Sequence, residues 1–152
     1  MSTIVAATHV PLFDRIAGFV EASADGRLMD AAGLRQSLLR DLARLLNSRN
    51  GLTIEAFLAA DASVLDYGLP DLLGLSPNSA LDLELLTSVV RHGLRLYEPR
   101  LQHVDVKAQR DAQRIGGARI VIAAAVTAGN QLCRVDFDVL MDSQSMQLAG
   151  AA

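Results

Sequence analysis

Leu94-Arg95-Leu96-Tyr97-Glu98-Pro99-Arg100-Leu101 is the stretch at which the sequence changes from a helical to a strand pattern. Pro99 predicts that change, because its ring disfavours the α conformation at Glu98 and it has no backbone N–H to donate. The helix is therefore expected to end by Glu98. A carboxylate there faces the negative end of the helix dipole, which costs roughly 0.3–1 kcal/mol, and Arg100 is the nearest offset. The pair is either a solvated ion pair at a helix end or a group presented to a partner.

The sequence after this stretch has a period of two and predicts three strands, at residues 100–108, 118–128 and 131–141. The last two strands are joined at Gly129-Asn130, which is typical of a two-residue hairpin turn. This turn predicts an apolar face with the pairs Val126–Cys133, Ala124–Val135, Ile122–Phe137 and Ile120–Val139. A shift of one residue would mix apolar and charged side chains, so the pattern specifies the register.

The sequence before this stretch predicts two long helices, at residues 34–47 and 79–97, with apolar residues three and four positions apart. The expected fold class is therefore α+β, with N-terminal helices followed by a small three-stranded antiparallel sheet packed on those helices. Its expected domain organisation is a flexible N-terminal arm at 1–10, a single domain at 11–145 and a fraying tail at 146–152.

Shorter segments complete the expected domain. Apolar residues at helical spacing predict a short amphipathic helix packed on the core, and these residues are Leu12, Phe13, Ile16, Phe19 and Val20. Thr53 is a candidate N-cap of another short helix. The loop at 63–72 mixes apolar anchors with turn residues, so we expect it to be pinned to the core. Gly68 is expected to hold a conformation that is closed to β-branched residues.

Composition excludes several classes of function. The chain has 152 residues and a net charge of −3, so it has no general attraction to phosphate backbones or anionic membranes. Cys133 is the only cysteine, which excludes an internal disulfide and a cysteine-based zinc cluster. We expect no export signal and no membrane span, since no apolar run approaches eighteen residues. These features predict a cytoplasmic protein with no membrane insertion.

Three motifs resemble the TssE family, the small baseplate subunits of type VI secretion systems, which is similar to the lysozyme-like wedge proteins of contractile phage tails. The motifs are Leu45-Leu46-Asn47-Ser48-Arg49, Tyr67-Gly68-Leu69-Pro70-Asp71 and Tyr97-Glu98-Pro99-Arg100-Leu101. Their order and the layout of helices followed by a sheet also match, so the resemblance covers most of residues 12–142. Ser48, Asp66 and Tyr97 depart from the usual Thr, Asn and Phe.

The resemblance implies a structural role in a contractile injection machine. It implies that Glu98, Pro99 and Arg100 grip the helical bundle made by neighbouring wedge subunits of the TssF and TssG type, with subunits of the TssK type as further baseplate partners. It also implies that the sheet is a template on which sheath proteins of the TssB/TssC type polymerise, through strand addition at an accessible edge. From this position we expect Glu98 and Arg100 to lie at the surface, so that their loss harms assembly more than folding.

The alternative function is a lysozyme-like glycoside hydrolase acting on peptidoglycan. That chemistry needs two carboxylates, one of which must stay protonated to donate a proton. Glu98 is the obvious candidate, but the nearby charge of Arg100 favours its ionised form. We therefore expect no catalytic residue.

Other kinds of site have weaker support in the sequence. His9, His92 and His103 lack the spacing of metal ligands, so no metal and no cofactor are expected. Nucleic-acid binding is also not expected. The arginines that could support it are Arg110, Arg114 and Arg119, which lack aromatic neighbours in an acidic chain.

Overall fold

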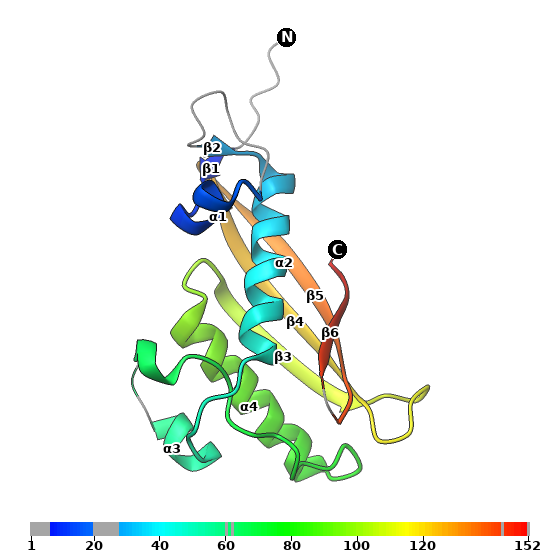
Figure 1. Cartoon of the computed structure of the whole chain (residues 1–152). Coiled ribbons are helices and arrows are strands. Elements are labelled where there is room, and N and C mark those ends of the chain that lie inside the picture. The colour runs from blue at the N-terminus through cyan, green and yellow to red at the C-terminus, as the bar shows by residue number, and fades with distance from the viewer. Residues whose placement is uncertain (1–6, 20–27, 60, 62, 144, 152) are drawn as a thin grey trace.

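The computed structural model describes residues 7–19, 28–59, 61, 63–143 and 145–151 (Figure 1). Helices and strands follow one another in the order β1 (Thr8–His9), α1 (Leu12–Ala17), β2 (Leu28–Met29), α2 (Ala31–Asn47), α3 (Ile54–Ala59), the 3-10 helix η1 (Val64–Asp66), α4 (Ala80–Tyr97), β3 (Gln102–Arg110), β4 (Ala118–Ala128), β5 (Gln131–Met141) and β6 (Met146–Ala151). Helices thus precede the main sheet, as the expected α+β class requires.

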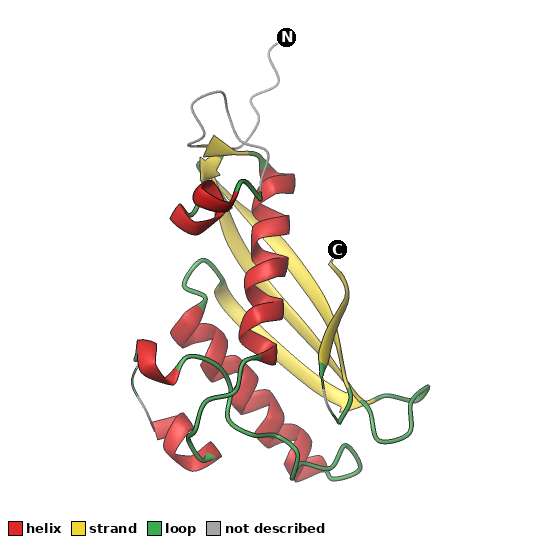
Figure 2. Ribbon diagram, viewed as in Figure 1, coloured by secondary structure: helices red, strands yellow, loops and turns green. Residues whose placement is uncertain are grey.

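The main sheet is antiparallel, with strand order β3-β4-β5-β6, and α2 crosses in front of it (Figure 2). The predicted register of the β4–β5 hairpin is confirmed in full, from Ala128 opposite Gln131 to Ala118 opposite Met141. Ile122 lies opposite Phe137, and both side chains are at most 1% exposed. The period of two in the sequence therefore predicted correctly which residues lie on each face of the hairpin.

The sheet has four strands, and the prediction of three was wrong. Met146–Ala151, which we expected to fray, forms β6 and pairs antiparallel with β5. Met146 is buried, and β6 packs against α2. Half of the six residues of this run are Ala or Gly, so it carries little periodic signal, and besides β5 it is held by a helix about a hundred positions away in the sequence.

The first long strand begins two residues later than predicted, at Gln102, and ends at Arg110. Its pairing with β4 is irregular between Gln102 and Asp105, where His103 has a left-handed φ of 52°. A β-bulge of this kind bends the strand locally. Beyond it the strand packs on α4 and buries Val106.

Both long helices are capped by side chains. Asp30 accepts a hydrogen bond from the Gly33 backbone N–H at 2.8 Å, and the Ser79 side chain accepts one from the Asp82 backbone N–H. Helix α4 ends at Tyr97, and Glu98 is its C-cap residue. The helix therefore stops where Pro99 predicted.

The loop between α3 and α4 is pinned to the core, as expected. Ser48 accepts a hydrogen bond from the Leu69 N–H at 2.9 Å, and the Leu69 side chain is fully buried. Gly68 has a φ of 116°, and a Cβ there would lie 2.7 Å from the Ser48 carbonyl oxygen. At Gly93 a Cβ would lie 2.5 Å from a Leu69 methyl carbon, so the absence of a side chain at Gly93 makes room for Leu69.

Part of the N-terminal arm that we predicted to be flexible, at residues 1–10, belongs to the fold. Thr8–His9 form β1 and pair with β2, and Val10 is buried in the core, so this part of the expected arm is ordered into the fold. Residues 1–6 and Val20 lie outside the described residues.

Helix α1 turns its apolar residues away from the core, which corrects the prediction that they pack on it. The exposed fractions are 63% for Leu12, 78% for Phe13, 74% for Ile16 and 55% for Phe19. Asp14, on the same helix, is buried at 7%. A polar contact with α2 therefore decides which side of α1 faces inward. In the described part of the chain, no helix is long and apolar enough to cross a membrane.

Candidate partner-binding site

The Glu-Pro-Arg corner, formed by Glu98, Pro99 and Arg100, is a tight turn between α4 and β3. The Glu98 N–H donates to the Leu94 carbonyl at 2.9 Å, and the Leu101 N–H donates to the Glu98 carbonyl at 3.1 Å. Pro99 is exposed at the tip of this turn. The backbone of the corner is thus fixed on both sides of the proline.

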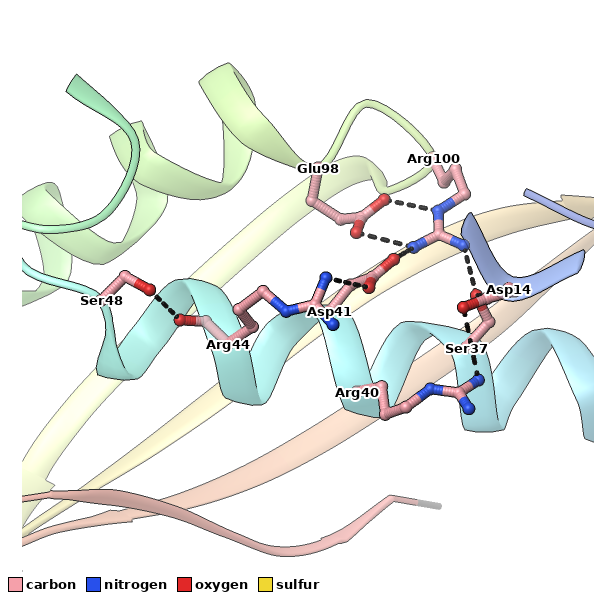
Figure 3. A network of polar contacts seen from close by, with 8 residues as sticks. All are labelled: Asp14, Ser37, Arg40, Asp41, Arg44, Ser48, Glu98 and Arg100. Carbon is pink, nitrogen blue, oxygen red and sulfur yellow. Dashed lines mark hydrogen bonds and ion pairs between the residues drawn. The ribbon is translucent and has the colours of Figure 1, made fainter. Parts of the chain in front are cut away.

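Glu98 and Arg100 form the predicted pair, with two parallel hydrogen bonds (Figure 3). Arg100 Nε donates to Glu98 Oε1 at 2.7 Å, and Arg100 Nη2 donates to Glu98 Oε2 at 2.9 Å. Glu98 is only 4% exposed, which corrects the expectation that it lies at the surface. The Arg100 side chain is 26% exposed. Of the two charged residues, only Arg100 is therefore open to a partner.

Arg100 also binds two residues of α2 that the sequence analysis did not single out. Its Nη2 donates to Asp41 at 2.5 Å, and its Nη1 donates to the Ser37 hydroxyl at 2.9 Å. Burial alone would lower the pKa of Arg100, but its hydrogen bonds and charge interactions with Glu98 and Asp41 raise the pKa above its ordinary value. Four of the five guanidinium N–H donors are used in this way.

The contacts continue from Ser37 to α1. The Ser37 hydroxyl donates its one hydrogen to Asp14 at 2.5 Å, and Asp14 lies 3.7 Å from Arg40 Nη2. Arg40 in turn packs over the Phe19 ring, 4.8 Å from its centroid. We call Asp14, Ser37, Asp41, Glu98 and Arg100 the polar network. It joins α1, α2 and the corner.

The three sequence motifs meet next to this network. The Tyr97 hydroxyl lies 2.9 Å from the Asp66 carbonyl, and its ring packs edge-on against Tyr67 at 5.2 Å between centroids. Gly68 lies against Ser48, as described above. The ends of α2 and α4 and the loop at 63–72 therefore form one continuous unit.

The alternative sites are not assembled in the described residues. No group of three or more His, Cys, Asp or Glu side chains there could hold a metal ion, and His92 packs edge-on against Phe57 at 5.1 Å. Arg119 is paired with Asp138 across the exposed face of the sheet, with a shortest contact of 2.6 Å. Both carboxylate oxygens of Glu98 accept hydrogen bonds from Arg100 and the side chain is buried, so neither oxygen is free to reach a substrate.

Sequence reasoning found the corner and missed its partners on α1 and α2. Arg100 is separated from Ser37 by 63 positions and from Asp41 by 59, so no local spacing connects them. Asp14 stands among apolar residues on a six-residue helix, where a carboxylate is usually a solvated residue. The one available signal was Ser37 and Asp41, two polar residues four positions apart on the same helix face.

Comparisons with known proteins identify the family to which the chain belongs. The sequence model of the family described as Baseplate wedge protein gp25 matches residues 32–131, which is more than half of the chain. No curated protein matched in a sequence search. A chain of a solved structure titled "The baseplate complex from the type VI secretion system" is similar in fold, with a TM-score of 0.52 and 22% identity over 72% of this chain and 94% of that chain. The resemblance based on the three motifs is thereby confirmed, and the chain belongs to the baseplate wedge protein gp25 family.

Proposed function

We propose that this chain joins the wedge subunits of a contractile injection machine of the type VI secretion kind to its sheath, and that its sheet is a template for sheath polymerisation. The observation that carries the proposal is the Glu-Pro-Arg corner. Arg100 is held by four hydrogen bonds while a quarter of its side chain stays exposed beside Pro99. A side chain fixed before binding loses little conformational entropy when a partner docks.

The surface around the corner suits a helical partner. Helix α1, which the polar network ties to Arg100, exposes the rings and aliphatic groups of Leu12, Phe13 and Ile16. An amphipathic helix or helix bundle offers an apolar stripe with polar flanks, and this arrangement complements an apolar patch beside charged side chains. We therefore assign the corner and the exposed side of α1 to the bundle of TssF- and TssG-type wedge subunits, in a baseplate that also holds TssK-type subunits.

The sheath side of the proposal rests on the sheet. Strand β6 is an edge strand, and a partner strand can bind to such an edge through main-chain hydrogen bonds. Sheath subunits of the TssB/TssC type would add their strands there. A cytoplasmic location and the absence of bound nucleic acid belong to this proposal as well.

Co-expression tests this function directly. The chain, carrying an affinity tag, is expected to co-purify with the wedge subunits of the same system at a fixed ratio in size-exclusion chromatography. Cross-links from the wedge subunits should fall on α1 and the corner. A complex that forms with cross-links confined to the far face of the sheet would contradict the assigned site.

The hydrolase alternative has a separate test. The family description names a structural part of a baseplate and no enzyme. We expect the purified chain to release no sugar from peptidoglycan, and Glu98→Gln to leave that baseline unchanged. Turnover that disappears in Glu98→Gln would support the hydrolase and overturn the scaffold function.

A further inference from the structure

The outer edge of β6 is partly closed by a side chain of the chain itself. Among the described strands, β6 has β5 on one side and no strand on the other (Figure 1). Asn47, the last residue of α2, lies against that outer side at Met146. Asn47 Nδ2 donates to the Met146 carbonyl and the Met146 N–H donates to Asn47 Oδ1, each at 2.9 Å. A carboxamide has the same donor and acceptor as a peptide group, so Asn47 pairs with Met146 as a neighbouring strand would.

The register of β6 shows which other groups face outward. The Asp142 N–H donates to the Ser145 carbonyl, which closes the turn between β5 and β6. Inward and outward pairs alternate along a regular antiparallel ladder, and the pairing with β5 is regular from Met146 to Leu148 before its register shifts at Ala149. Gln147, opposite Leu140, therefore faces β5 with its N–H and carbonyl, whereas Met146 and Leu148 face away from it. Asn47 binds the N–H and carbonyl of Met146, which are the first outward-facing groups of β6, and the next such groups belong to Leu148.

The fit at Met146 is specific for asparagine. The second N–H of Asn47 Nδ2 donates to the Ala43 carbonyl of its own helix at 2.8 Å, which fixes the orientation of the amide. Both donors and the acceptor of the amide are thus used. An aspartate of the same size would have no donor, and its charge would face the two carbonyl oxygens of Ala43 and Met146.

We infer that Asn47 is a positioning residue that closes the edge of β6 at Met146, so that a partner strand pairs with β6 only from Leu148 onward. The inference rests on the proposed function, since it names the register at which a sheath strand would join the template. A fixed starting point matters because a slip of one residue turns every side chain of the added strand to the opposite face. On this strand, Gln147 and Ala149 are exposed while Met146 is buried.

Hydrogen exchange of single amides in the isolated chain gives the first test. The Met146 N–H should exchange at least tenfold more slowly than the Leu148 N–H, because only the former is bonded in the described structure. Asn47→Asp and Asn47→Ala should bring Met146 to the rate of Leu148. Asn130→Asp, a change at the exposed hairpin turn, is the matched control and should leave both rates as they are. Equal rates for Met146 and Leu148 in the unmodified chain would overturn the inference.

The second test uses the purified sheath heterodimer of the same secretion system as the probe. Its binding should slow exchange at Leu148 and leave Met146 unchanged in the unmodified chain. In Asn47→Ala it should slow both amides, which would report a longer or shifted pairing. An identical pattern in the two proteins would overturn the register inference alone, whereas no sheath binding to the unmodified chain would overturn the proposed template function as well.

A variant at Leu148 keeps the test independent of how Asn47 affects folding. Leu148→Pro removes the outward N–H without touching a bond to β5, and proline is tolerated on edge strands. It should weaken binding of the sheath heterodimer at least tenfold. Leu148→Ala, which keeps the N–H and loses the same packing, is the control and should bind within about threefold of the unmodified chain. Equal binding by both variants would contradict pairing at Leu148.

Discussion

Arg100 contributes to the fold before it can contribute to any partner, because it binds carboxylates from its own turn and from α2. Glu98 is buried, and Arg100 binds both of its carboxylate oxygens. Glu98→Gln would place an amide N–H against the guanidinium, so we expect the free energy of unfolding to fall by about 1–3 kcal/mol. Asp138→Asn, in the exposed pair with Arg119, is the matched control and should lower the free energy of unfolding by clearly less. Urea denaturation measures both; equal small losses would show that the corner is an ordinary surface ion pair.

Gly68 is the residue at which backbone geometry is most demanding. Its φ of 116° is unfavourable for any L side chain, and a Cβ would overlap the Ser48 backbone. We expect Gly68→Ala to lower the free energy of unfolding by about 2–5 kcal/mol, from backbone strain and overpacking together. Gly116 also has a positive φ, 75°, but open space around it, so Gly116→Ala should cost only about 1–2 kcal/mol. A smaller loss at Gly68 than at Gly116 would refute the close contact.

At the scale of elements, we expect the exposed apolar side chains of α1 to contribute to binding but little to the stability of the fold. Phe13 is 78% exposed, so Phe13→Ser should change the free energy of unfolding by no more than about 0.5 kcal/mol. It should nevertheless weaken binding to the wedge subunits at least tenfold, since it removes a central ring from the apolar patch. Leu81→Ser, at a 77% exposed position on α4, is the control and should leave binding intact. Calorimetric titration gives both affinities, and unchanged binding by Phe13→Ser would remove α1 from the site.

Long periodic elements were predictable, and short ones were not. The β4–β5 hairpin has eleven residues a side with one consistent apolar face, so a single register fits. Helix α1 has six residues, and the contacts of buried Asp14 with Ser37 and Arg40 outweigh the apolar preference of its other side chains. Strand β6 binds Asn47 at Met146, and the motif of Asn47 was recognised without any indication of what its amide binds.

For the whole molecule, the sequence predicted the family and the location of the corner. It did not predict the burial of Glu98 or the contacts of Arg100 with α2. Glu and Arg two positions apart indicate a local ion pair. Charged residues are mostly exposed in proteins, so the sequence favoured a pair at the surface. Burial of Glu98 depends on the packing of α2 and α4 near the corner. Only the tertiary structure brings Ser37 and Asp41 to Arg100.

The central claim is that the Glu-Pro-Arg corner recognises the wedge subunits, and the affinity of Arg100→Lys for their purified complex tests it most directly. Lysine keeps the charge and loses the fork that holds Glu98, Asp41 and Ser37 together. We predict at least tenfold weaker binding, with a melting temperature that shows the chain still folded at the temperature of the assay. Arg119→Lys, in the exposed pair on the sheet, should bind as the unmodified chain does. Unchanged affinity of folded Arg100→Lys would contradict the account and leave the corner a purely structural helix end.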